Sequence, residues 1–479
     1  MRQLIWFRTD LRIRDNTALH AALQAGPTVA VFLTSPGQWQ AHDDAACKVD
    51  FWLRNLRSLR AELQRLNVPL LIRPAERWRD TPAVLARLCR ELQIDSVHVN
   101  EEYGLNERRR DEDVAHHLQT QGVDFHSHFD RLLLRPGSVL TRSGGYFQVF
   151  SQFRKACYQR LQVALPPPLD PPRAQAPLPL ESDPLAAAVP GFATPEASLQ
   201  VLWPAGETAA HERLEHFAEQ HLHAYDRQRD LPALPGTSQL SAYLAAGVLS
   251  PRQCLHAALR SNQGEFETGS SGAVTWINEL LWREFYGHIL VGFPQVSRHR
   301  AFRPHTEALP WRHAPEELAA WQQGRTGFPL IDAAMRQLSA TGWMHNRLRM
   351  VVAMFLTKNL LINWREGERF FMRHLIDGDL AANNGGWQWS ASTGTDAVPW
   401  FRLFNPVTQS QRFDPQGRFI RHWLPELAHL DDRLIHQPSA AGGLFGVAGY
   451  PPPMVDLAAS RARALNAFKN LAAQEPQHV

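Results

Sequence analysis

A proline-rich stretch in the middle of this 479-residue chain limits what the chain can fold into. Eleven of its 34 prolines lie between Pro166 and Pro204. Because proline lacks a backbone N–H and fixes φ, residues 165–190 of this region should form neither a helix nor a central strand. We therefore interpret residues 136–205 as an inter-domain connector, and we expect separate domains at residues 1–135 and 206–479.

The first domain should alternate strands with helices. Runs rich in β-branched and aromatic residues predict strands at residues 3–7, 29–35, 69–74, 96–100 and 123–129. Between them, residues 50–66 place leucines at helical spacing, and another helix should begin with Thr81 as its cap and Pro82 in its first turn. This alternation predicts a parallel, doubly wound α/β domain. The glycine fingerprints of dinucleotide and P-loop folds are missing, although the strand ends could still bind a ligand.

The second domain should be all-helical, because no series of strand patterns follows residue 206. It holds ten of the fifteen tryptophans, from Trp276 to Trp423. Tryptophan usually packs in cores and interfaces, so a helical core rich in aromatic residues is the simplest interpretation of this concentration.

Composition excludes several classes of protein. Hydrophobic residues make up 44% of the chain and charged residues 20%, which are globular values. No apolar run approaches the roughly 20 residues that span a bilayer, and the N-terminus lacks the apolar segment of a secretory signal. The four cysteines lie far apart, which predicts a reducing compartment without disulfides or a zinc site. We expect a cytoplasmic protein that holds no metal ion.

One helical pattern, TWINELLWREFYGH, mixes aromatic and charged residues on one surface. Trp276, Glu279, Arg283 and Tyr286 fall on adjoining positions, with Trp282 beside them. Taken alone, the pattern is also typical of a helical ion pair flanked by core aromatic residues.

A second pattern, TGWMHNRLRM, places Trp343, Asn346, Arg347 and Met350 on one predicted helix face, with Arg349 nearby. An amide beside two guanidinium groups suits phosphate or base recognition. A solvated basic helix end explains it equally well.

Hydroxyl groups precede a third predicted helix. Thr237, Ser238 and Ser241 lie where a loop with proline and glycine should open this helix. Free N–H groups and hydroxyls at a helix start form a phosphate cradle, but they also form an ordinary N-cap.

The stretch LIDGDLAANNGGWQW is the most unusual of the four patterns, because it combines paired aspartates, asparagines, glycines and tryptophans. Asp377 and Asp379 could belong to an Asx turn and the sequence NNGG to a tight turn, with Trp387 and Trp389 bracing both. No single pattern decides the function, but the presence of all four in one chain favours the functional interpretation of each.

Together these segments resemble the photolyase/cryptochrome family. The likeness extends from LIWFRTDLRIRDNTAL near the start to GRFIRHWLPEL near residue 427. Its most specific parts are TGFPLIDAAMRQLSATGWMHNRLRM and LIDGDLAANNGGWQW. The chain is similar to class I members, which repair cyclobutane pyrimidine dimers in DNA. The resemblance implies an α/β antenna domain, a long connector and a helical FAD domain. It also implies a reaction in which reduced FAD, excited by blue light, donates an electron to a flipped dimer.

The resemblance assigns flavin-binding roles to one set of positions. These are Tyr225, Thr237, Ser238, Gln239, Leu240, Ser241, Asn346, Arg349, Asp377, Gly378, Asp379 and Asn383. The hydroxyl-bearing segment would meet the pyrophosphate, and the two aspartates would lie beside the isoalloxazine ring. Asn383 matches the position that faces flavin N5, where a neutral amide can accept the N5–H bond without repelling an anionic reduced flavin.

A second set matches the lining of the substrate cavity and the DNA contacts: Arg229, Glu279, Trp282, Asn346, Arg347, Met350, Trp389, Arg402 and Gln409. Trp282 and Trp389 would clamp the flipped dimer, and Glu279 would hydrogen-bond the pyrimidine edge. The arginines would grip phosphates. Trp387, Trp364 and Trp311 match an electron-hopping chain that reduces the flavin from the surface inward.

The antenna site is matched less closely. His42, Asn106 and Glu107 match a folate-binding rim, but Ser297 and Arg298 replace the cysteine and lysine of folate-binding relatives. We expect methenyltetrahydrofolate there, with a deazaflavin or an empty pocket as alternatives. Gln239 replaces a frequent arginine, which removes one cation near the flavin phosphates.

Two other functions within the family stay open. A blue-light-sensing cryptochrome would keep FAD and the tryptophans without repair, but Asn383 and the intact Glu279, Trp282 and Trp389 set favour repair. A (6–4) photoproduct photolyase is expected to carry histidines where Asn346 and Met350 stand. We therefore expect a monomeric bacterial repair enzyme that needs no protein partner and is associated with the nucleoid when bound to DNA containing pyrimidine dimers.

Overall fold

The computed structural model describes residues 1–440 and 447–473. The chain divides into two compact units. The first unit consists of Met1–His223, Ser238–Pro294 and Ile376–Asp379. The second unit consists of Ala224–Thr237, Gln295–Leu375 and Leu380–Val479.

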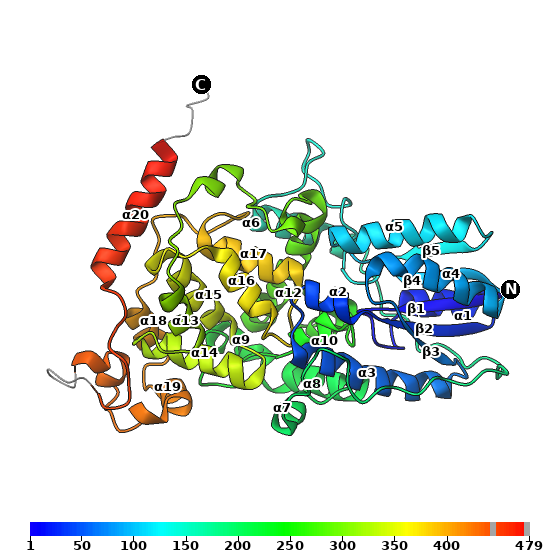
Figure 1. The fold of residues 1–479 in the computed structure, drawn as a ribbon, viewed down its shortest axis with the longest axis horizontal. Helices are drawn as coiled ribbons and strands as arrows, with labels where there is room; N and C mark the ends of the chain where they lie inside the picture. The colour runs from blue at the N-terminus through cyan, green and yellow to red at the C-terminus, as the bar shows by residue number, and fades with distance from the viewer. Residues whose placement is uncertain (441–446, 474–479) are drawn as a thin grey trace. The chain divides into compact units, whose positions relative to one another are not determined.

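The first unit is built on one parallel sheet with the strand order β3-β2-β1-β4-β5 (Figure 1). The strands are β1 (Arg2–Phe7), β2 (Thr28–Thr34), β3 (Leu70–Pro74), β4 (Ile94–Asn100) and β5 (Asp124–His128). Right-handed crossovers from β1 to β3 and from β3 to β5 run in opposite directions, so they place helices on both faces. This confirms the predicted doubly wound α/β fold, and the order reverses between β1 and β4.

Helices complete the first unit. Those that connect the strands are α1 (Thr17–Ala25), α2 (Pro36–Ala41), α3 (Ala46–Arg65), α4 (Thr81–Leu92) and α5 (Leu105–Gln119). Those that follow are α6 (Phe150–Val163), α7 (Ala197–Leu202), α8 (Glu207–Gln220), α10 (Ser241–Ala245), α11 (Pro251–Ser261) and α12 (Ser271–Gly292). Helices α4 and α5 pack against each other (Figure 1). The stripe predicted on α3 is confirmed, because Phe51, Leu56 and Leu63 are fully buried.

One local prediction in this unit is wrong, and another is confirmed. The N-cap of α4 is Asp80 rather than Thr81, because a 3₁₀ turn at Trp78–Asp80 leads directly into the helix. Residues 165–190 form neither a helix nor a strand, which confirms the prediction for the most proline-rich part. The short helix α7 follows it between Pro195 and Pro204, where no proline interrupts the helix.

The rest of the proline-rich stretch covers the edge strand β3. Asp183 donates its backbone N–H to the carbonyl of Leu70 over 2.9 Å, and its carboxylate accepts the N–H of Ile72 over 2.8 Å. Gln175 exchanges hydrogen bonds with the backbone of Thr28 over 2.7 and 2.8 Å. The stretch thus satisfies backbone groups that an exposed edge would present to other chains.

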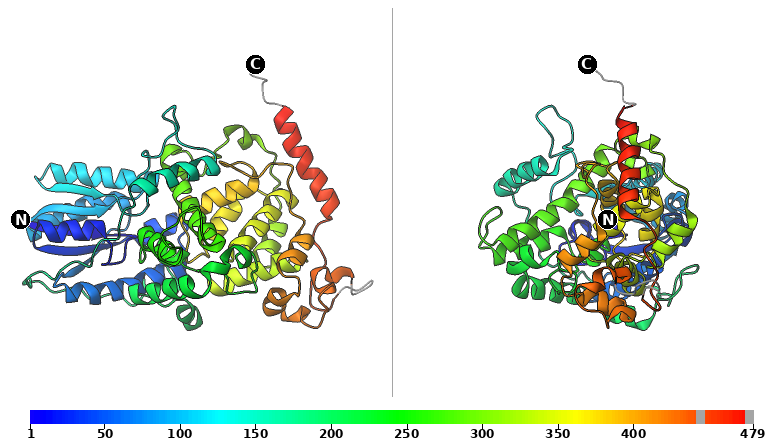
Figure 2. Two further views of the ribbon diagram at one scale, coloured as in Figure 1. Left: turned by 180° about the vertical axis from the view of Figure 1, so that it is seen from behind. Right: turned by 90° about the vertical axis from the view of Figure 1, so that its left-hand side faces the viewer.

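The second unit is helical, as predicted, and no strand occurs after β5 in the described part of the chain. Its helices are α9 (Tyr225–Gln228), α13 (Pro315–Gln322), α14 (Pro329–Thr341), α15 (Asn346–Met354), α16 (Trp364–Met372), α17 (Leu380–Ala391), α18 (Pro406–Phe413), α19 (Arg418–Trp423) and α20 (Leu457–Ala473). Helices α14, α15, α16 and α17 surround one core that holds Trp321, Trp364 and Trp387 (Figure 2). The sequence NNGG lies inside α17, which excludes the tight turn considered above.

Candidate functional site

The predicted site residues are shared between the two units. The first unit carries His42, Asn106, Glu107, Ser238, Gln239, Leu240, Ser241, Glu279, Trp282, Asp377, Gly378 and Asp379. The second unit carries Tyr225, Arg229, Thr237, Trp311, Asn346, Arg347, Arg349, Met350, Trp364, Asn383, Trp387, Trp389, Arg402 and Gln409.

In the first unit, charged side chains gather where β1 and β4 end. Glu102, just after β4, is buried and accepts hydrogen bonds from Thr9, just after β1, and from Arg110 over 2.8 Å. The guanidinium of Arg110 lies 4.8 Å from the ring of Trp6 and 4.6 Å from that of Trp78. Ligands of open α/β sheets bind at this reversal of strand order, so the cluster marks a candidate ligand crevice.

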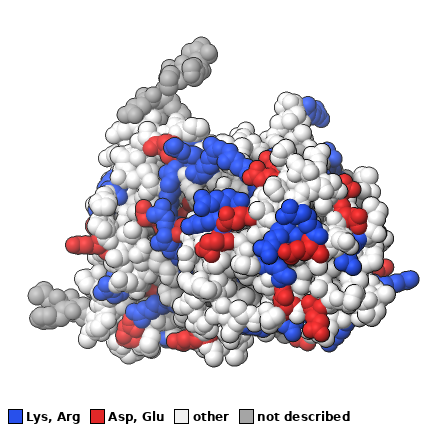
Figure 3. All heavy atoms as spheres, turned by 45° about the vertical axis from the view of Figure 1, so that its right-hand side comes forward, with Lys and Arg blue, Asp and Glu red and all other residues white. Residues whose placement is uncertain are grey.

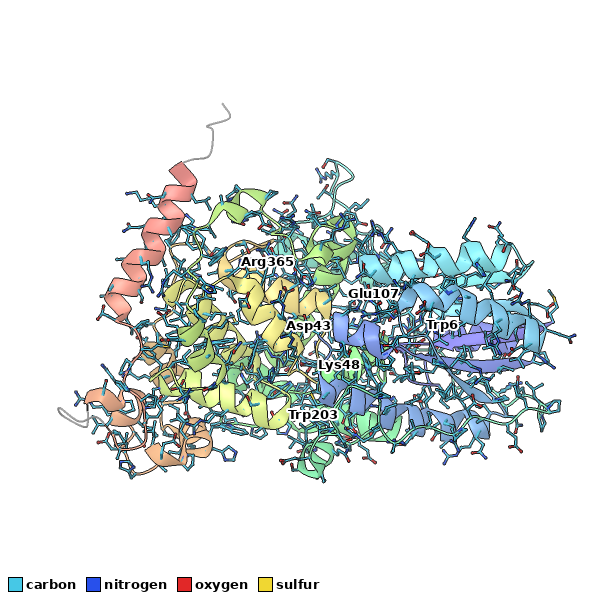
Figure 4. All side chains as sticks on the ribbon, in the orientation of Figure 1. Trp6, Asp43, Lys48, Glu107, Trp203 and Arg365 are labelled. Atoms are coloured by element: carbon cyan, nitrogen blue, oxygen red, sulfur yellow. The ribbon has the colours of Figure 1, made fainter. Side chains whose placement is uncertain are left out.

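The predicted antenna residues border this cluster. Asn106 Nδ2 lies 3.2 Å from His42 Nε2, and the His42 ring meets Trp78 edge-on with the ring centroids 4.7 Å apart. Glu107 stands in the first turn of α5, and Figure 4 shows it in the first unit with Trp6 of β1. Burial and the neighbouring charge of Glu102 raise the pKa of Glu107 to about 7. A carboxyl group that is half protonated near neutral pH can donate as well as accept a hydrogen bond.

The segment Ser238–Ser241 is bound by a residue that the sequence did not indicate. Gln239 has a left-handed backbone with φ of 51°, and its side-chain oxygen accepts a 3.0 Å hydrogen bond from Arg213 of α8. A guanidinium therefore lies beside the position where relatives carry an arginine. Arg213 is 26 residues away in the chain and has no local signal.

Helix α12 confirms the predicted helix, and it changes the expectation for how Trp282 can stack on a ligand. Glu279 and Trp282 are both half-buried on it. The ring of Trp282 stacks on Phe150 at a centroid distance of 3.8 Å with 10° between the planes. Since Phe150 covers one face of the indole, only the other face can stack on a ligand.

In the second unit, the side chain of Asn383 has a fixed orientation. Its Nδ2 donates a 3.0 Å hydrogen bond to the backbone carbonyl of Glu368, which leaves Oδ1 as an acceptor on the opposite side of the amide. The buried carboxylate of Glu368 also accepts a 2.8 Å bond from Asn384 and lies 2.9 Å from Nδ1 of His299. Asn384 in turn accepts from Gln388 over 2.8 Å, so α16 and α17 are joined by a continuous polar network.

The three predicted relay tryptophans differ in burial. Trp364 and Trp387 are almost fully buried in one core cluster, and Trp311 is partly exposed and packs at the margin of that cluster. The guanidinium of Arg365 lies 4.6 Å from the Trp364 ring. The ring of Trp387 meets Trp321 and Phe371 edge-on at 6.0 and 5.0 Å. Burial decreases toward Trp311, as a path from the surface inward requires.

Gly367 of α16 is required by the Trp387 ring. A Cβ at this position would lie 2.0 Å from Trp387 Cη2, so Gly367→Ala should displace the ring and lower the free energy of unfolding by about 1–3 kcal/mol. Thermal unfolding followed by tryptophan fluorescence measures this. Gly386→Ala in α17 is the matched control, because a Cβ there meets no atom within 4 Å. Equal loss of stability in both variants would contradict the assignment.

Two of the predicted DNA-contacting arginines already have partners within the second unit. Arg347 binds Asp230 through two hydrogen bonds of 3.2 and 2.9 Å and lies 4.5 Å from the Phe413 ring. Arg229 lies 5.5 Å from the ring of Tyr225, which is a predicted flavin contact. Figure 3 likewise shows that Lys and Arg side chains gather in groups with acidic side chains beside them.

One predicted helix face is wrong. Helix α15 begins at Asn346 with His345 as its N-cap, so Trp343 precedes the helix and does not share its face. Asn346, Arg347 and Met350 remain on α15. Arg402 is exposed and follows Phe401, which is 56% exposed. The sequence analysis did not single out Phe401, although an apolar ring beside an arginine is a common feature of nucleic-acid contacts.

Two kinds of feature are absent from the described residues, 1–440 and 447–473: a metal-binding group and a membrane-spanning helix. No group of three His, Cys, Asp or Glu residues is placed to hold a metal ion. No helix there is long and apolar enough to cross a membrane.

Two family models match separate parts of the chain. Residues 3–173 match the DNA photolyase domain, and residues 276–470 match the FAD binding domain of DNA photolyase. The deoxyribodipyrimidine photo-lyase of Escherichia coli is 42% identical over 97% of this chain and 98% of its own length. The crystal structure of a bacterial class III photolyase from Agrobacterium tumefaciens is 34% identical with a TM-score of 0.88, covering 99% of this chain and 98% of that one. A cryptochrome from Synechocystis is 29% identical with a TM-score of 0.88, covering 98% of this chain and 99% of that one.

A parallel α/β unit and a region that matches the FAD binding domain of DNA photolyase together define a two-part flavoprotein. The chain belongs to the DNA photolyase family. The fixed amide of Asn383 fits the flavin, because its free oxygen is the acceptor that the N5–H of a reduced ring needs.

Proposed function

We propose that the chain is a deoxyribodipyrimidine photo-lyase that splits cyclobutane pyrimidine dimers in DNA with the energy of blue light. The observation that carries this proposal is the 42% identity to the Escherichia coli enzyme along the whole length of both chains. In this proposal residues 1–135 form the antenna domain, residues 136–205 the connector and residues 206–479 the catalytic domain. The enzyme acts as a monomer on DNA in the bacterial cytoplasm.

The proposed flavin site uses the residues matched above. Tyr225, Asn346 and Arg349 would hold the cofactor together with the Ser238–Ser241 segment and the loop Ile376–Asp379. When bound, reduced FAD supplies the excited electron that splits the dimer. Asn383 keeps its amide oxygen toward N5 because its nitrogen is bound to the carbonyl of Glu368.

The proposed substrate site holds the flipped dimer by stacking and by one carboxylate. Trp282 offers only the face that Phe150 leaves open, and Trp389 offers a second ring. Stacking of this kind contributes about 1–3 kcal/mol per base. Glu279 hydrogen-bonds the pyrimidine edge, and Met350 fills the apolar side.

The DNA backbone is bound by arginines. Arg229, Arg347 and Arg402 contact phosphates, with Gln409 beside them. Because Asp230 already binds Arg347 through both carboxylate oxygens, this arginine is held in one orientation before DNA binds.

Trp311, Trp364 and Trp387 deliver electrons from the surface to restore the reduced cofactor. In the antenna site, His42, Asn106 and Glu107 bind methenyltetrahydrofolate. A carboxyl group with a pKa near 7 at Glu107 can form a hydrogen bond with the pterin edge in either protonation state.

The likeness to a cryptochrome from Synechocystis makes light signalling the second candidate. Both functions use the same fold and flavin, so only catalysis separates them. The deciding experiment irradiates the protein with blue light together with a thymine-dimer oligonucleotide and measures the restored thymines, with a dark control. Repair in the light alone supports the proposal, and flavin reduction without repair contradicts it. An oligonucleotide with a (6–4) photoproduct tests the third alternative.

Replacing Glu279 with alanine should lower the repair yield per absorbed photon about tenfold, the loss expected for one hydrogen bond between a charged group and the dimer. FAD content should not change, because Glu279 does not belong to the proposed flavin site. The measurement is repair by pre-reduced enzyme under counted photons. An unchanged yield would refute the role of Glu279.

A further inference from the structure

The acidic loop Ile376–Asp379 belongs to the first unit, although the chain on both sides of it belongs to the second. Asp379 of this loop forms an ion pair within the first unit. Arg131 Nη2 lies 3.8 Å from Asp379 Oδ2, and the two side chains are 16% and 31% exposed. Asp379 is one of the two carboxylates that the proposed flavin site places beside the ring.

Arg131 is held from three directions. Its Nη1 donates to Thr9 Oγ1 over 2.5 Å and to Glu102 Oε1 over 3.1 Å, and its backbone carbonyl accepts a 2.7 Å bond from Arg283. Thr9 follows β1, Glu102 follows β4, and Arg283 is on α12. Two hydrogen bonds to one guanidinium nitrogen, and a third to the backbone of the same residue, restrict where the second nitrogen can lie.

The anchor itself is rigid. Glu102 is buried and is shared with Arg110, whose guanidinium is held by the rings of Trp6 and Trp78. Arg8, Arg110 and Arg131 together outweigh the effect of burial and keep the pKa of Glu102 well below its usual range. Glu102 is therefore an anion that offsets part of the positive charge of Arg131.

We propose that Arg131 is a positioning residue that fixes Asp379 of the acidic loop on the carboxyl end of the sheet and offsets its charge. This rests on the proposed flavin site, in which Asp379 lies beside the ring. The sequence Glu102, Arg131, Asp379 then forms a chain of alternating charge. Removing either of the first two members should change the potential at the flavin, in opposite directions.

Arg131→Gln should leave the negative charge of Asp379 less compensated and disfavour the anionic reduced flavin. At the potential where the wild type is half reduced, the ratio of oxidised to reduced flavin should rise about tenfold, which equals about 30 mV for this two-electron couple. Glu102→Gln should move the ratio about threefold in the opposite direction, because Arg131 then loses its other anion. Both ratios are measured by spectroelectrochemistry of the FAD-loaded protein in the dark.

Two further variants separate charge from packing. Arg131→Lys should restore at least half of the shift in potential, because it restores the charge. Arg135→Gln should leave the potential unchanged, because Arg135 is 55% exposed and pairs with Glu101 instead, at 3.1 Å. Equal potentials in wild type and Arg131→Gln, or shifts of the same sign in Arg131→Gln and Glu102→Gln, would overturn the proposal. The readout needs neither light nor DNA, so failure of repair by the wild type would contradict the proposed function and not this inference.

Discussion

Asp130→Ala should be among the most destabilising single substitutions in the first unit, with a loss of about 3–5 kcal/mol in the free energy of unfolding. The carboxylate of Asp130 is completely buried and is the shared partner of two buried guanidinium groups. Arg12 donates to one oxygen, and Arg252 donates to the other over 2.7 Å. The second oxygen also accepts a 2.9 Å bond from the hydroxyl of Thr17. Alanine would leave both positive charges buried with one partner fewer.

Asp130 stays ionised although it is buried. Burial raises the pKa of Asp130, but Arg12 and Arg252 lower it by more than burial raises it, so that the pKa is about 2. A carboxyl group whose folded pKa lies below its unfolded value of 3.8 stabilises the protein above that value. The contribution is lost as the pH falls from about 4 through about 2. At pH 7 it is fully present, so the substitution should show its whole effect there.

The measurement is amide hydrogen exchange in β1, followed by mass spectrometry at pH 7. Its exchange should accelerate by two to three orders of magnitude if opening becomes about 3–4 kcal/mol easier. Asp124→Ala is the matched control, because Asp124 is an exposed aspartate at the start of β5. It should change the exchange of β1 by less than about threefold, corresponding to 0.5 kcal/mol. A loss below about 1 kcal/mol for Asp130→Ala would show that Arg12 and Arg252 find other partners.

The strands β1, β2 and β4 could be predicted from sequence because inner strands of a parallel sheet are buried and read as continuous apolar runs. All five predicted runs overlap the observed strands, and all but β4 agree to within one residue at each end. The strand order could not be predicted. It depends on which strands meet side by side, and local patterns in the sequence do not carry that information.

The candidate site was predictable only where its residues form specific motifs. The motif around Asn383 predicts a role for this residue, but the orientation of its amide depends on Glu368, fifteen residues away. Arg213, Asp230 and Phe150 contact predicted site residues from distant parts of the chain and carry no local signal. Helical spacing also failed for Trp343, because periodicity alone does not show where a helix begins.

Trp387→Phe should abolish photoreduction of the oxidised flavin, with a fall in rate of at least about a hundredfold, since each tenfold step needs only about 1.4 kcal/mol of barrier. In the proposed relay the buried indole of Trp387 is the last carrier before the flavin, and phenylalanine is much harder to oxidise. The effect should not extend to repair by chemically reduced enzyme, because the electron for repair starts at the cofactor. Flash photolysis of the oxidised protein and repair assays of the pre-reduced protein measure the two rates separately.

Trp321→Phe is the control for packing. Trp321 is as buried as Trp387, and the two rings meet edge-on at 6.0 Å, so both substitutions leave a similar void in the same core. The relay assigned through Trp364 and Trp311 predicts that Trp321→Phe keeps most of the photoreduction, whereas Trp364→Phe loses it. If Trp321→Phe were as damaging as Trp387→Phe and Trp364→Phe were not, the electron would enter through Trp321 instead. Loss of repair by the pre-reduced Trp387→Phe protein would indicate a disturbed flavin site, because Gly367 and Phe371 fit closely around the indole.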